Sequence, residues 1–107
     1  MDIINLTPHA ITFIGTDNMV TRVVEPSDTL ARVKATTITV GEIDGIPVTG
    51  TSYGEVEGLP LPQDDTIYIV SSLVAQRVPE RLDVFIPNES VRDDKGRIIG
   101  CRSLGRV

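Results

Sequence analysis

The chain has 107 residues, a formal net charge of −5 and one cysteine. This length suits a single folded domain, and one cysteine excludes an intramolecular disulfide and a zinc site built from four cysteines. The net negative charge argues against binding to long nucleic acids, because a polyanion needs a broad basic surface.

The low aromatic content, 4% of residues, leaves the core to Val, Ile and Leu, which favours β-structure. No apolar run reaches the length of a membrane span. The N-terminal residues lack the basic start and apolar stretch of a signal peptide. We therefore expect a cytoplasmic protein that makes no contact with a membrane.

The first half of the chain predicts β-hairpins. The apolar run 2–6 predicts a strand that ends before Pro8, and residues 10–25 predict a hairpin around a turn at 16–18. Alternation along 29–43 predicts a long strand. Asp44-Gly45 is a strong turn signal, so residues 46–54 are expected to return as its partner.

The second half predicts a loop, one helix and more strands. Gly and Pro at 54–65 predict an exposed loop, and the apolar run beginning at Thr66 predicts a strand. A serine cap predicts a helix over 71–78 that Pro79 stops. Strands are expected at 82–87 and 97–107, with Gly100 at a bulge or a close approach.

These elements together indicate one compact domain over residues 1–107. Its fold class is α+β, a mostly antiparallel β-sheet with one short helix. The positive charges gather in its last part: residues 77–107 hold seven Lys and Arg against five Asp and Glu, whereas residues 1–76 hold three against ten. Such asymmetry is typical of an anionic partner, with the alternative that the arginines spread over a solvated face.

The C-terminal stretch contains the groups that a phosphorylated ligand needs. Arginine grips phosphate through a planar fork, an aromatic ring stacks on a base, and an amide pairs with the base edge. The residues that could fill these roles are Arg92, Arg97, Arg102, Phe85 and Asn88. The structural alternatives are core packing for Phe85 and capping of the turn after Pro87 for Asn88.

Catalytic chemistry has weaker support. The common nucleotide-binding, metalloprotease and serine-hydrolase motifs are missing. His9 lies in an expected turn, and Cys101 reads as a small buried apolar residue. The pairs Asp64-Asp65 and Asp93-Asp94 lie in expected turns, where aspartate bonds the local backbone. We expect no enzyme, no cofactor and no metal.

Three segments carry a resemblance to a known family. "INLTPHAI", "YGEVEGLPLPQDDTIYIVSSLVA" and "VPERLDVFIPN…VRDDKGRIIGCRSL" resemble small proteins of phages and prophages. Among these the chain is similar to the anti-Thoeris sponge proteins of the first type, which sequester a cyclic ADP-ribose isomer used as an immune signal. The family carries more helix at its C-terminus than this sequence predicts.

The resemblance implies non-catalytic capture of a small cyclic nucleotide in the cytoplasm of an infected bacterial host. It places the ligand roles on Arg32, Phe85, Asn88 and Arg102, with Arg92 and Arg97 as substitutes, in a dimer or hexamer. A homo-oligomer is also expected because a small β-domain gains by closing its sheet edges. The alternative function is a small virion or assembly subunit that acts through protein–protein contacts.

Overall fold

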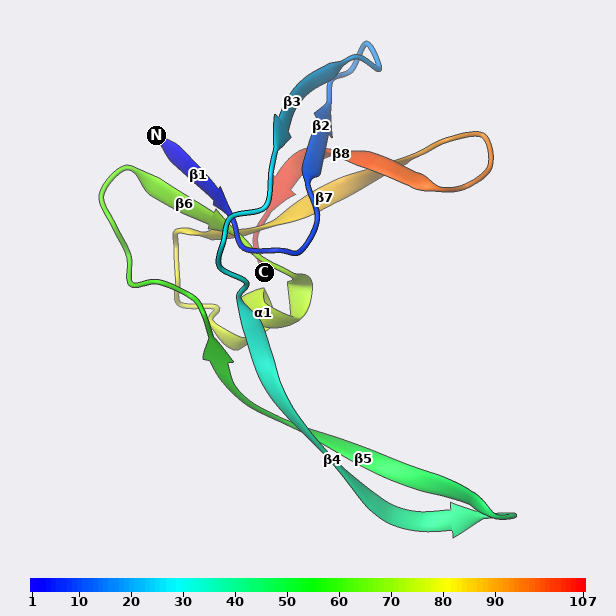
Figure 1. Ribbon diagram of the computed structural model, residues 1–107. Coiled ribbons are helices and arrows are strands. Elements are labelled where there is room, and N and C mark those ends of the chain that lie inside the picture. The colour runs from blue at the N-terminus through cyan, green and yellow to red at the C-terminus, as the bar shows by residue number, and fades with distance from the viewer.

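The computed structural model describes residues 1–107, and six of its eight strands form one sheet, the sheet body (Figure 1). The strand order across the sheet body is β1-β6-β7-β8-β2-β3. The strands are β1 (Asp2–Asn5), β2 (Ile11–Ile14), β3 (Val20–Val24), β6 (Thr66–Ile69), β7 (Val84–Arg92) and β8 (Ile98–Gly105).

Strand directions in the sheet body are mixed. β1, β6 and β7 run parallel to one another, and β2 lies parallel to β8 through the pair Phe13 and Cys101. The hairpins β2/β3 and β7/β8 are antiparallel. The longest ladder of the sheet body, β7/β8, is antiparallel, and the predicted class, α+β with mostly antiparallel sheet and one short helix, is confirmed.

The one helix, α1 (Ser72–Arg77), begins where the sequence predicts. The Ser71 side chain accepts a hydrogen bond from the backbone N–H of Val74 at 3.4 Å, which satisfies one free donor of the first turn. Val74 and Ala75 are buried. The helix ends at Val78, the residue before Pro79, because proline disfavours helical backbone in the residue before it. No helix of the structure is long and apolar enough to cross a membrane.

The core lies where α1 covers one part of the sheet body. Seven buried side chains form it: Leu6, Ala31, Tyr68, Val70, Val74, Ala75 and Val84. The expectation of an aliphatic core holds apart from Tyr68, the largest fully buried side chain, whose hydroxyl donates to the Leu61 carbonyl at 3.5 Å. Only 13 of 107 residues are buried, so stability depends on a small group of side chains.

A long antiparallel ribbon, the arm, projects from the sheet body (Figure 1). It consists of β4 (Arg32–Ile43) and β5 (Ile46–Glu57), paired from Arg32 and Glu57 to Ile43 and Ile46. The predicted Asp44-Gly45 turn is confirmed, with φ of 50° and 82° as a type I′ turn requires. Every residue from 34 to 49 is exposed.

The arm makes the molecule elongated. Its principal extents are 52 × 40 × 24 Å and its radius of gyration is 16.9 Å, against about 13 Å for a globular chain of this length. The expectation of a compact domain is therefore wrong. The sequence pattern of the arm predicts paired strands but does not reveal that no other element covers their outer half.

The C-terminal hairpin also differs from its prediction. β7 continues to Arg92, five residues beyond the expected strand, so Asn88 lies within a strand and does not cap a turn. The close approach at Gly100 is confirmed. A Cβ atom there would lie 2.7 Å from both the Ile14 Cδ1 atom and the Thr12 carbonyl oxygen, so only glycine lets β8 approach β2 this closely.

Candidate ligand-binding site

Two of the predicted arginines lie together at the tip of the β7/β8 hairpin. Arg92 donates to the Gly96 carbonyl at 2.7 Å, and the Arg97 Nε donates to Asp93 at 2.9 Å. The Asp93 carboxylate also accepts from the backbone N–H groups of Lys95 and Arg97. These bonds lower the pKa of Asp93 and hold both guanidinium groups against their own turn.

Arg102, Asn88 and Phe85 lie elsewhere on the same two strands. Arg102 donates to the Gly15 carbonyl and to the side-chain oxygen of Asn18 in the β2/β3 turn. Asn88 lies over Gly105, where an added Cβ would be 3.0 Å from the Asn88 Cβ. Phe85 is half-buried outside the core cluster, and the Arg106 guanidinium lies 5.9 Å from its ring centre.

Arg32 is separate from all of these, at the base of the arm, where its Nε lies 3.5 Å from the Glu57 carboxylate. Five of the six predicted residues thus lie along the β7/β8 hairpin and Arg32 lies apart, and none of the five larger cavities is lined by more than one of them. Their binding role stays a prediction.

A separate cleft lies between the end of α1 and the base of the arm. Its volume is about 630 Å³, within the range of small-molecule sites. The segments that meet there are far apart in sequence: β5, the loop after it, and the chain around the end of α1. The cleft is lined by Gly54, Glu55, Val56, Leu59, Gln76, Arg77, Val78 and Arg81.

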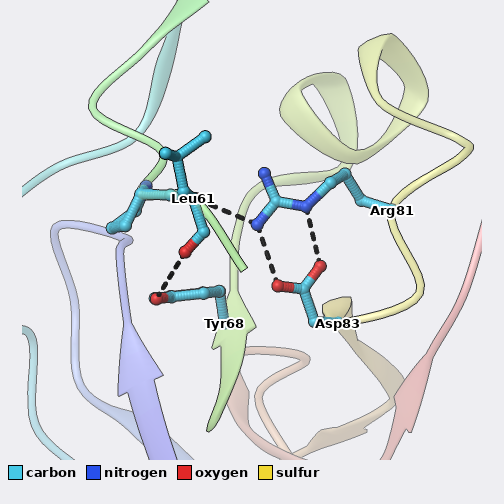
Figure 2. Close-up of polar contacts among 5 residues, drawn as sticks. Leu61, Tyr68, Arg81 and Asp83 are labelled. Carbon is cyan, nitrogen blue, oxygen red and sulfur yellow. Dashed lines mark hydrogen bonds and ion pairs between the residues drawn. The ribbon is translucent and has the colours of Figure 1, made fainter. Parts of the chain in front are cut away.

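Arg81 lines this cleft. Figure 2 shows the contacts that hold its side chain. Its Nε and Nη2 atoms each donate to a carboxylate oxygen of Asp83 at 2.8 Å, and Nη2 also donates to the Pro60 carbonyl at 2.9 Å. The Arg81 guanidinium lowers the pKa of Asp83, and the hydrogen bond to Asp83 raises the pKa of Arg81. Such a two-point ion pair fixes the plane of the guanidinium, while its Nη1 makes no hydrogen bond within the chain.

Arg77 lines the same cleft. Its Nη2 donates to the backbone carbonyls of Tyr53 at 3.1 Å and Gly54 at 3.3 Å, which ties the last turn of α1 to β5. The Nε and Nη1 donors of Arg77 have no partner in the chain. Both guanidinium groups are positioned by protein contacts and keep donors free for the oxygen atoms of a ligand, while Asp83 balances the charge of Arg81.

The other lining residues add an amide, a carboxylate and apolar surface. The Gln76 amide nitrogen donates to the Ser72 hydroxyl at 3.0 Å, so the amide orientation is set. Glu55 can accept hydrogen bonds from hydroxyl groups. Val56, Leu59 and Val78 supply an apolar wall that packs against the core. The cleft therefore suits a ligand with phosphate, hydroxyl and flat apolar parts.

Arg77 and Arg81 belong to the C-terminal cations of the sequence but are not among the predicted ligand residues. The available signal was their spacing of four residues around the helix end in "QRVPER". Their convergence depends on contacts with Tyr53, Gly54 and Pro60, more than twenty residues away, which no local pattern predicts.

The candidate catalytic groups Cys101 and His9 lie outside this cleft. Cys101 is buried, as expected, and burial raises the pKa of its thiol, which keeps the thiol protonated. The His9 side chain is exposed, while its carbonyl accepts hydrogen bonds from the side chains of Asn5 and Thr7. No group of three or more His, Cys, Asp and Glu lies close enough to hold a metal ion.

Comparison with protein-family models, with curated proteins and with solved structures finds no match to this chain. The resemblance to phage sponge proteins therefore rests on the quoted sequence segments and stays a prediction. The structural features that bear on function are the cleft itself and the chemistry of Arg77 and Arg81.

Proposed function

We propose that this chain binds a small phosphorylated ligand in the cleft between α1 and the base of the arm and holds it without chemical change. The observation that carries the proposal is the pair of fixed guanidinium groups, Arg77 and Arg81, on one cleft of about 630 Å³. Arg77 keeps its Nε and Nη1 donors and Arg81 keeps its Nη1 donor, so the pair offers three nitrogen atoms to the oxygens of a phosphorylated ligand.

A nucleotide is the ligand class that uses the remaining surface of the cleft. Its phosphates pair with Arg77 and Arg81, its ribose hydroxyls donate to Glu55, and its base lies against Leu59 and Val56 with Gln76 at the base edge. Combined with the sequence resemblance, this chemistry favours sequestration of a cyclic nucleotide signal, such as a cyclic ADP-ribose isomer, in the infected host.

The proposal is tested by ligand retention. The protein is incubated with cyclic ADP-ribose isomers and cyclic dinucleotides, freed of unbound nucleotide, and heated to release what it holds. The proposal expects intact nucleotide. Release of a changed nucleotide would show an enzyme, and retention of none would refute the proposal.

Variants locate the site. Arg77→Ala removes free donors from the cleft, and loss of hydrogen bonds to a charged group, about 1.5–3 kcal/mol, should weaken binding by about tenfold or more. Arg22→Ala is the matched control, because it makes the same change on the exposed strand β3 outside the cleft. Arg102→Ala distinguishes the two candidate sites. If Arg102→Ala loses ligand binding and Arg77→Ala does not, the ligand lies on the β7/β8 strands instead.

A second candidate function, a small assembly subunit that acts through protein–protein contacts, is favoured by the arm. No other element of the chain covers its outer half, and several aliphatic side chains are exposed on it. The two functions do not compete, because the cleft uses only the base of the arm and leaves its outer half free for a partner.

A further inference from the structure

The two faces of the arm have opposite character. In an antiparallel ribbon, paired residues lie on the same face, and successive residues of one strand lie on opposite faces. The pairing of β5 is regular from Ile46 to Gly50, so Ile46, Val48 and Gly50 lie on one face. Their partners Ile43 and Ile38 lie on that face with them. This face is called the aliphatic face.

The bulge between Thr39 and Gly41 adds one more side chain to the aliphatic face. A Cβ atom placed on Gly50 would lie 3.6 Å from the Val40 Cγ1, so Val40 covers Gly50 on that side. The opposite face carries threonines: Thr39 is paired with Thr49, and the hydroxyls of Thr37 and Thr51 lie 3.4 Å apart.

The aliphatic face has no cover within the chain. Its Ile38, Val40, Ile43 and Ile46 side chains are each 60–65% exposed, although they follow one another along a single ribbon. An isolated two-stranded hairpin is only marginally stable in water, and a contiguous exposed aliphatic patch on a soluble protein marks an interaction surface.

We infer that the aliphatic face is an interface between two copies of this chain, packed arm against arm about a two-fold axis near Val40 and Gly50. Each copy then presents the same patch to the other, as a two-fold interface requires. A Cβ placed on Gly41 would meet nothing within 4 Å, so the backbone there leaves a hollow between the Ile and Val side chains that a side chain of the other arm can fill. The inference does not depend on the ligand cleft.

The charges at the two ends of the arm favour one relative direction of the two packed arms. Gly54 follows Gly50 on the aliphatic face, and a Cβ placed on Gly54 would be 3.7 Å from the Lys34 Cβ, so Lys34 lies on this face near the base of the arm. Asp44 lies at the tip of the arm. Parallel arms would set Lys34 against Lys34 and Asp44 against Asp44. Antiparallel arms set each Lys34 beside the partner's tip, so charge complementarity favours the antiparallel packing.

The available area supports a weak to moderate dimer. Two stacked aliphatic faces bury on the order of 1,000 Å² in total, the lower limit of specific interfaces. Most of that area is aliphatic, which gives more stabilisation per unit area than the polar rim of an average interface. We expect an equilibrium between monomer and dimer in the micromolar range.

Sedimentation equilibrium of the full chain over a range of concentrations tests the inference. The wild type should approach twice the chain mass of 11.6 kDa as concentration rises. The variant Ile38→Thr/Ile43→Thr keeps β-branched side chains, and so the hairpin, but removes aliphatic contact. Its dimer dissociation constant should rise about tenfold or more. The matched control, Thr39→Val/Thr49→Val, changes the opposite face and should leave dimerisation unchanged.

The charge arrangement has its own test. Lys34→Glu should weaken the dimer, and adding Asp44→Asn should restore part of the loss, since asparagine tolerates the positive φ of 50° at this turn. A wild type that stays monomeric at high micromolar concentration would overturn the inference. So would a dimer that Ile38→Thr/Ile43→Thr leaves intact while circular dichroism shows the variant folded.

Discussion

The sheet body and the arm are built from similar residues but stabilised in different ways. In the sheet body, Tyr68 and Val70 are fully buried in the core with the α1 residues Val74 and Ala75, and Ile69 is fully buried between its neighbours in the sheet. In the arm, an equally aliphatic set that includes Ile38 and Ile43 is exposed. Strand formation therefore requires only the local pattern and turn, whereas burial requires a partner element, and only the sheet body has one within the chain.

The junction between the two regions is well fixed. Val33 and Val56 at the base of the arm pack against the core, and Arg77 bonds two carbonyls of β5. The arm is thus a directed projection with an anchored base and an uncovered outer half. This arrangement favours an interaction role for the outer half and a binding role for the cleft at the base.

The largest expected difference between the regions is the cost of removing an isoleucine. Ile69→Ala in the sheet body should lower the free energy of unfolding by roughly 2–5 kcal/mol, because it leaves a cavity at a fully buried position. Ile38→Ala in the arm should change it by less than about 0.5 kcal/mol in dilute, monomeric protein. Urea denaturation of both variants measures this, and equal losses would contradict the comparison.

The junction is tested by Gly58, which follows β5. Gly58 has a φ of 82°, and an added Cβ would lie 2.3 Å from the Leu30 carbonyl oxygen. Gly58→Ala should therefore cost about 3 kcal/mol through both strain and a backbone clash. Gly96→Ala is the matched control: its φ is 81° but its added Cβ meets nothing within 4 Å, so it should cost only about 1 kcal/mol. Thermal unfolding compares the two variants, and similar melting temperatures would show that the backbone clash at residue 58 has no cost in stability.

The ion pair beside the cleft predicts a pH dependence. The Arg81 guanidinium lowers the pKa of Asp83 in the folded chain, so the pair stabilises the fold above the unfolded pKa, about 3.9. That contribution is lost as the pH falls below about 4 towards the folded pKa. Asp83→Asn should cost about 1.5 kcal/mol at pH 7 and flatten the stability profile below pH 4. An unchanged acid profile for Asp83→Asn would show that the pair contributes nothing.

Local signals were sufficient to predict most elements. Asp44-Gly45 fixes the turn of the arm, and Ser71 fixes the start of α1, because both act on neighbouring backbone. The parallel order of β1, β6 and β7 could not be predicted this way, since β1 and β6 are joined only through non-local pairing. For the same reason the cleft was missed: Arg81 reaches it by bonding Pro60, across a loop.

Amide hydrogen exchange, followed residue by residue at low and high protein concentration, tests most directly whether the outer arm depends on a second copy. The account predicts that amides of β6 and β7 are protected at every concentration, whereas those from Thr36 to Val48 exchange quickly when dilute and become protected as the dimer forms. Strong protection of the outer arm in dilute monomer, equal to that of the sheet body, would contradict the account, because the arm would then be stable without a partner.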